Sequence, residues 1–120
     1  MTNFILRIMI NALAIAAAVK LVDGIIFTGE WWKIILVGLV FGIVNTLIKP
    51  VVTFFSLPLI VLTLGIFTIV VNALMLMLTA YLSKPLDLGL SIAGFWPALW
   101  GAIIVSIVSI LLSWISGVRR

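Results

Sequence analysis

Long apolar blocks fill most of this chain and leave little sequence for anything except membrane-spanning helices. The blocks lie at about residues 4–22, 32–48, 58–82 and 95–118. A helix needs about 20 mainly apolar residues to cross a bilayer, and each block is close to that length. Of the 120 residues, 66% are hydrophobic and 8% are charged, whereas soluble domains are about half apolar and about a quarter charged. We therefore expect one all-α integral membrane domain, residues 1–120, with four transmembrane helices.

The residue types that usually perform chemistry are scarce. The chain has no cysteine and no histidine, which excludes disulfides, thiolate nucleophiles and imidazole ligands. Its three carboxylates, Asp23, Glu30 and Asp87, lie outside the deep parts of the apolar blocks, where a proton relay or cation site would need them. Without a nucleophile and base in plausible proximity, we predict no enzyme activity, no cofactor and no metal.

The positive charge indicates orientation in a membrane and does not indicate nucleic-acid binding. The net charge is +4, but the basic residues are mostly spread singly along the chain and form no patch. Four spans would place Arg7, Lys49, Arg119 and Arg120 on one side and Lys20, Lys33 and Lys84, with all three carboxylates, on the other. Because cytoplasmic loops carry an excess of Lys and Arg, we expect both termini in the cytoplasm.

Aromatic residues mark the expected ends of several spans. Trp31 and Trp32 precede the second block, Tyr81 closes the third and Trp96 opens the fourth. Amphipathic rings of this kind gather at the headgroup level of a bilayer. We expect all four side chains to be interfacial and to contact membrane lipids.

The stretch from Pro50 to Leu82 is too long for one span and too short for two. As one helix it would measure about 50 Å, against a hydrocarbon core of about 30 Å. Pro58 disfavours helix at Leu57 and can itself open a helix at its first position. We therefore predict a short interfacial or re-entrant segment at 50–57, with the third span beginning at Pro58.

The second half of the chain partly echoes the first. Trp32 and Asn45 align with Trp96 and Ser109 at a shift of 64 positions, while the Asn-Ala-Leu string at 11–13 recurs at 72–74, a shift of 61. One hypothesis is a tandem repeat of two helical hairpins related by a pseudo-two-fold axis along the membrane normal. The alternative is chance similarity between low-complexity apolar segments.

A few polar side chains lie within or beside the blocks. Asn45 and Asn72 either hydrogen-bond to neighbouring helices and to the backbone broken by Pro50 and Pro58, or line a polar path. We favour the first reading, because isolated amides make a poor pore, and we expect both side chains to point into the bundle. Lys49 either reaches the headgroups as a long surface lysine or recognises an anionic lipid phosphate.

Several short strings resemble a known family. The N-x-x-I-K-P string at 45–50, L-P-L at 57–59, and the string at 63–67 that contains Thr63 and Gly65, followed by Asn72-Ala73, are similar to the bacterial four-transmembrane-segment proteins called phage holin family 4, superfamily IV, or YvlD-like. The resemblance covers nearly the whole chain. It implies a location in the bacterial cytoplasmic membrane and supplies no catalytic residues, since most members have no known function.

Three functions from different classes stay open. The first is a non-enzymatic structural or accessory membrane protein that packs with itself, as a homo-oligomer, or with a larger membrane complex. The second is a holin-like pore former, which needs polar helix faces that only the serines of the last block offer. The third is a small transporter or lipid-handling protein, for which no ionisable midplane residue is present. We favour the first.

Overall fold

The computed structural model describes residues 2–63 and 65–117 of the chain. Five helices and two short strands follow one another. The elements are α1 (Thr2–Leu21), β1 (Ile25–Phe27), α2 (Lys33–Leu47), α3 (Lys49–Leu62), α4 (Phe67–Ser83), β2 (Leu90–Ile92) and α5 (Phe95–Ser116). The mainly helical architecture agrees with the expectation from the sequence.

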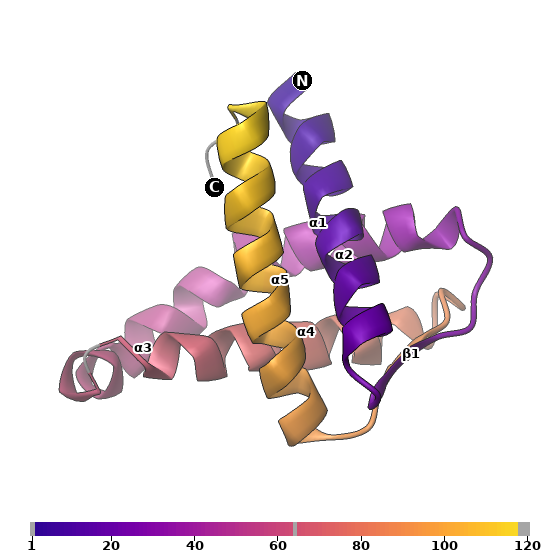
Figure 1. The fold of residues 1–120 in the computed structure, drawn as a ribbon. Helices are drawn as coiled ribbons and strands as arrows, with labels where there is room; N and C mark the ends of the chain where they lie inside the picture. Colours follow the sequence, from indigo (N-terminus) through magenta and orange to yellow (C-terminus); the bar gives the residue numbers. More distant parts are fainter. Residues whose placement is uncertain (1, 64, 118–120) are drawn as a thin grey trace.

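The first and last helices run antiparallel, side by side, and α2 and α4 pass behind them at a wide angle (Figure 1). The start of α1 and the end of α5 lie at the same end of the molecule. Both helices are long and apolar enough to cross a membrane, since 20 residues of helix measure about 30 Å. In the described part of the chain, α2 and α3 pass the same test only as a bent pair, and α4 is a shorter apolar helix.

Small residues let α1 and α2 approach closely. A side chain at Gly38 would lie 2.8 Å from the backbone of α1, at both the Ala12 nitrogen and the Ile8 oxygen. Within lipid, helices associate through such close packing, because lipid chains are as apolar as the side chains and provide no hydrophobic drive. Gly38 and the alanines of α1 therefore determine how tightly the first two helices pack.

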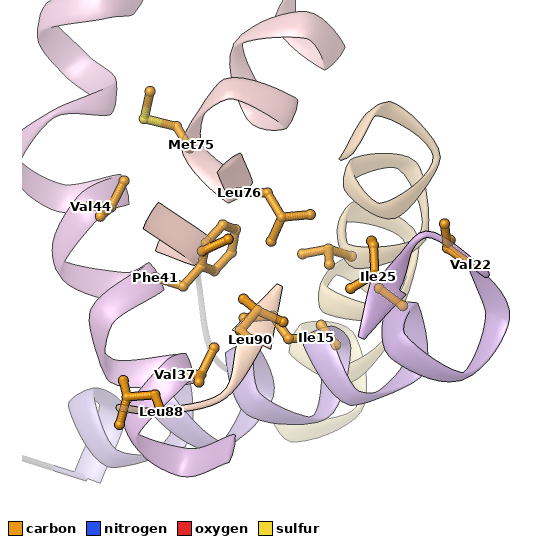
Figure 2. Close-up of a cluster of buried hydrophobic side chains, with 14 residues drawn as sticks. Ile15, Val22, Ile25, Val37, Phe41, Val44, Met75, Leu76, Leu88 and Leu90 are labelled. Carbon is orange, nitrogen blue, oxygen red and sulfur yellow. The ribbon is translucent and has the colours of Figure 1, made fainter. Parts of the chain in front are cut away.

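The main hydrophobic core lies where α1, α2, α4 and α5 meet the two strands. Figure 2 shows the side chains of Phe41, Leu76 and Leu90 pointing toward one another. Ile15 of α1 and Ile25 of β1 complete this centre and are almost fully buried. The helices supply most of this core, and each strand adds one buried side chain, Ile25 and Leu90.

The prediction that a helix begins at Pro58 was wrong. Pro58 lies inside α3, on an exposed face, and the chain breaks instead after Leu62. The hydroxyl of Thr63 donates to the Leu59 carbonyl over 2.8 Å and accepts the Phe67 N–H over 3.0 Å. Gly65 follows with a φ of 92°, a conformation that favours glycine. Thr63 and Gly65 therefore stop α3 and start α4, whereas a proline in an exposed helix is tolerated.

A second bend lies between α2 and α3, whose axes differ by 55°. Ile48 separates the two helices, and Lys49 and Pro50 form the first turn of α3. None of the residues of α3 is buried. The bend directs α3 away from the rest of the bundle (Figure 1).

The connections after α1 and α4, expected to be loops, contain paired strands that the sequence analysis missed. The antiparallel register is Ile25 with Ile92, Ile26 with Ser91, and Phe27 with Leu90. The Ala93 N–H donates to the Gly24 carbonyl over 2.8 Å and the Thr28 N–H to the Gly89 carbonyl over 2.9 Å. These bonds tie the two halves of the chain together away from the bundle centre.

Candidate functional site

A cleft of about 600 Å³ opens between the first turns of α1, the end of α2 and the last turns of α5. Phe4 and aliphatic residues of α1 and α2 form most of its wall. Its polar lining consists of Arg7, Asn11, Asn45, Thr46, Lys49 and Ser113. Helices from both ends of the chain therefore build one pocket that is mainly apolar and has polar groups from every wall.

Two cations line this cleft. Arg7 is exposed on the second turn of α1, and Lys49, the first residue of α3, is half-buried. The bend between α2 and α3 places Lys49 at the cleft instead of extending it away along the axis of α2. None of the lining residues is a carboxylate. The electrostatic character of the cleft is thus positive.

Two buried oxygen atoms at the cleft lack hydrogen-bond partners. These are Asn45 Oδ1 and Ser113 Oγ, which make no hydrogen bond within the described residues. Leaving a buried polar group unsatisfied costs about 1 to 3 kcal/mol. Thr46 differs, because its hydroxyl donates to the Gly42 carbonyl over 2.8 Å. The cleft therefore offers a ligand the Ser113 hydroxyl as a donor and the Asn45 amide oxygen as an acceptor.

A comparison of two asparagines shows why the cleft is open. Asn72 Nδ2 of α4 donates to Ser106 Oγ of α5 over 3.4 Å. Asn11 of α1 faces α2 at Gly42, where an added Cβ would lie 3.2 Å from Asn11 Nδ2. Glycine offers no hydroxyl. Asn11 is only 8% exposed and lines the cleft, so its amide borders the space that a serine would occupy.

The polar residues predicted from the sequence are only partly brought together. Asn45 and Lys49 meet at the cleft, while Asn72 is part-buried and bonds to Ser106. Asn72 has a side-chain partner and not the proline-broken backbone we expected. Asn45 Oδ1 has no hydrogen-bond partner among the described residues, so its expected bond was wrong. Pro50 lies in the first turn of α3.

Sequence reasoning missed Arg7, Asn11 and Ser113 as members of this site. Each interrupts an apolar block, and Asn11 was noted as a polar residue of the first block and for its echo at position 72 but was not assigned to a site. Their convergence depends on the antiparallel packing of α1 and α5, which joins the two ends of the chain. A single block carries no local signal for that contact.

The aromatic residues expected at the interface are exposed. Trp31, Trp32, Tyr81 and Trp96 all present more than a third of their surface. Trp32 Nε1 donates to the Glu30 carboxylate, and Lys33 Nζ donates to the Asp87 carbonyl over 3.0 Å and lies 3.9 Å from its carboxylate. This charged group surrounds the start of α2, whereas the cleft lies at its other end.

Among the described residues that line the cleft there is no carboxylate, histidine or cysteine. Across residues 2–63 and 65–117, no three His, Cys, Asp or Glu side chains gather in a way that could hold a metal ion. Guanidinium, ammonium, amide and hydroxyl groups bind anions and polar head groups. The cleft is therefore suited to binding.

Comparison with known proteins agrees with this description of a small membrane protein. A family described as "Mycobacterial 4 TMS phage holin, superfamily IV" matches residues 2–111. The chain belongs to this family. The resemblance drawn from the strings around Lys49, Pro58 and Gly65 is thereby confirmed.

Two similar proteins come from Streptomyces coelicolor and Bacillus subtilis. An uncharacterized protein of Streptomyces coelicolor is 49% identical over 114 residues, 91% of each chain. The uncharacterized membrane protein YvlD of Bacillus subtilis is 34% identical over 112 residues, 93% of this chain and 91% of its own. No solved structure matches the chain. The Bacillus relative and the family description both indicate a membrane protein.

Proposed function

We propose that this protein is a non-enzymatic structural or accessory component of the bacterial cytoplasmic membrane, which packs with a second copy of itself or with a larger membrane complex. The observation that carries the proposal is α3. Most of its 14 residues are apolar and none is buried, and it projects from the bundle (Figure 1). The fold of the monomer does not account for this surface.

The exposed face of α3 is suited to contact with another apolar surface. Phe54 and Phe55 are 67% and 77% exposed, and Val61 and Leu62 are 70% and 78% exposed. The two aromatic rings meet edge to face with centroids 5.5 Å apart. Aromatic residues are enriched at the centres of protein interfaces. A partner helix packed on α3 would bury these side chains.

Four spans and an internal duplication form part of the same proposal. In each half, a helix, a short strand and a second helix follow one another, and the strands pair antiparallel about Ile26 and Ser91. Glycines bracket both strands at the same spacing, at positions 24 and 29 and positions 89 and 94. A two-fold axis through the strand pair would relate two halves of this kind. The shared order of elements supports the duplication, and each half would then contribute two spans.

The distribution of charge supports cytoplasmic termini. Arg7 and Lys49 line the cleft at the end of the molecule where α1 starts and α5 ends. Lys33 is instead joined to Asp87 at the other end of α2. Since cytoplasmic ends of membrane proteins are rich in Lys and Arg, we place the cleft on the cytoplasmic side.

The test is the size and composition of the particle that is extracted from native membranes in mild detergent. We expect a homo-oligomer or a complex with another membrane protein. Replacing Phe54 and Phe55 together by Gln should dissociate it. Trp114 and Ile115 of α5 are similarly exposed, and the paired Gln replacements there serve as the control. A monomer without partners, or equal dissociation by both pairs, would contradict the proposal.

A holin-like pore former is the alternative that the family description favours. Such a pore needs polar helix faces that point outward between subunits. Ser109 and Ser113 of α5, the residues first considered for this role, are buried within the subunit. Release of a trapped dye from vesicles that contain the purified protein would support the pore instead of the accessory role.

A further inference from the structure

We propose that the cleft between α1, α2 and α5 binds the phosphate of an anionic lipid whose head group carries hydroxyls. Arg7 and Lys49 would contact the phosphate, Asn11, Asn45 and Ser113 would contact the hydroxylated head group, and the acyl chains would leave over the apolar rim. This site lies apart from the exposed face of α3. The inference therefore goes beyond the proposed function and does not depend on it.

The charge of the cleft selects an anion. Arg7 carries a guanidinium group whose planar N–H donors match phosphate oxygens. Lys49 adds a second positive charge from a different helix. Neither Glu30 nor Asp87 lines the cleft; both lie near the start of α2. The described lining residues include two cations and no carboxylate, which favours an anionic group over a cationic or neutral one.

The buried polar atoms specify more than a bare anion. Ser113 is 6% exposed, and its hydroxyl has no partner within the described chain. A phosphate oxygen could accept from this hydroxyl. Asn45 Oδ1, also buried and unpartnered, instead requires a donor. A ligand that supplies both a phosphate acceptor and a hydroxyl donor would satisfy the two groups, whereas a fully substituted amine head group would not.

In the second half of the chain, the contact that corresponds to Asn11 and Gly42 contains a serine beside the asparagine. Between α4 and α5, Ser106 fills the space beside Asn72 and accepts its amide. Between α1 and α2, Gly42 leaves the same kind of amide, that of Asn11, beside the cavity. If both contacts served packing alone, a hydroxyl at position 42 would close the second one. Gly42 instead leaves the Asn11 amide in the lining of the cleft.

The apolar part of the cleft favours a lipid over a free phosphate. Phe4, Ile43 and Leu47 line it, and each exposes about half of its side chain or more. Acyl chains lying on this rim would add van der Waals contacts, which favour close packing of apolar groups within lipid. A free phosphate would gain nothing there.

Binding is measured with the full-length protein in a neutral detergent, by native mass spectrometry and by thermal shift. The probes are phosphatidylglycerol, phosphatidylcholine, glycerol phosphate and inorganic phosphate. We expect phosphatidylglycerol to bind at least tenfold more tightly than phosphatidylcholine, and the two water-soluble phosphates to bind at least tenfold more weakly than the lipid. Equal binding of the two lipids would overturn the proposal. Equally tight binding of inorganic phosphate would overturn the lipid as the source of the anion.

Charge variants assign the binding to the cleft. The double variant Arg7→Gln, Lys49→Gln should weaken phosphatidylglycerol binding at least tenfold. The single variant Arg7→Lys keeps Lys49 and both positive charges, and it should bind the lipid more tightly than the double variant does. Lys20→Gln with Lys84→Gln, at sites that do not line the cleft, removes the same charge and should leave binding unchanged. Equal weakening by both pairs would indicate general attraction and overturn the site.

A variant that keeps both cations tests whether weaker binding reflects the cleft itself and not a loss of folding. Gly42→Ser places a hydroxyl beside Asn11 and reduces the space of the cleft. We expect a folded protein with unchanged net charge and at least fivefold weaker phosphatidylglycerol binding. Undiminished binding by this folded variant would exclude the cleft as the lipid site.

Discussion

Asn72 of α4 donates a hydrogen bond of 3.4 Å to Ser106 of α5 and so joins the two helices of the second half of the chain. An amide in hydrocarbon is costly unless something accepts from it. In this contact a neighbouring helix directly satisfies an asparagine within an apolar helix. The free energy that this hydrogen bond contributes can be compared with the cost of the unpartnered Asn45 and Ser113 oxygens at the cleft.

The first prediction concerns this hydrogen bond. Asn72→Leu and Ser106→Ala should each destabilise the folded protein, with a coupling energy of about 0.6 to 1.7 kcal/mol in a double-mutant cycle. The measurement is reversible unfolding in detergent. Thr46→Val removes a hydroxyl that bonds only within its own helix and should show no coupling to Asn72. Strict additivity of the Asn72 and Ser106 variants would show that the bond contributes nothing.

Gly42→Ser should stabilise the protein by about 0.5 to 1 kcal/mol, because serine favours helix over glycine and its hydroxyl can pair with Asn11. The new Cβ would lie 3.2 Å from Asn11 Nδ2. The amide can move away because it borders the cleft. Gly42→Ala supplies the helix propensity without the hydroxyl, so thermal unfolding of the two variants separates the effects. A serine variant less stable than the alanine variant would contradict the proposed pairing.

The helical content and apolar spans were predictable because hydropathy acts locally along the chain. The break before the fourth helix was not placed correctly, since we relied on the general preference against helix before Pro58. The stop depends on side-chain chemistry, namely the Thr63 hydroxyl and the positive φ of Gly65. Both residues were visible in the sequence, but they were used only for the family resemblance.

The strands and the cleft could not be predicted because they depend on contacts distant in sequence. Each strand has three residues, too few for an alternating pattern to stand out against apolar neighbours. The cleft joins Arg7 with Ser113 from opposite ends of the chain. Asn45 and Lys49 were found because a polar residue in an apolar block is conspicuous, whereas their shared location required the packing of α1 against α5.

Gly38→Ala should destabilise the protein by at least 1 to 3 kcal/mol, the usual cost of overpacking. The added methyl group would lie 2.8 Å from two backbone atoms of α1, and backbone cannot rotate away as a side chain can. The two helices would have to separate along their contact. Gly42→Ala, one turn further along α2, meets only the Asn11 side chain and is the matched control. Comparable stability of the two variants in thermal unfolding would mean that α1 and α2 do not pack this closely.

The turn between α3 and α4 provides the last prediction. Gly65 has a φ of 92°, and an added Cβ would contact nothing within 4 Å, so substitution there tests backbone conformation without steric overlap. Gly65→Ala should destabilise the protein by about 1 to 2 kcal/mol, since L-residues other than glycine are strained at positive φ. Gly65→Asn should cost less, because asparagine adopts such conformations more readily. Unfolding in detergent measures both. If alanine were tolerated as well as asparagine, the chain would not stop α3 at Gly65, and a continuous helix through residue 65 would have to be considered again.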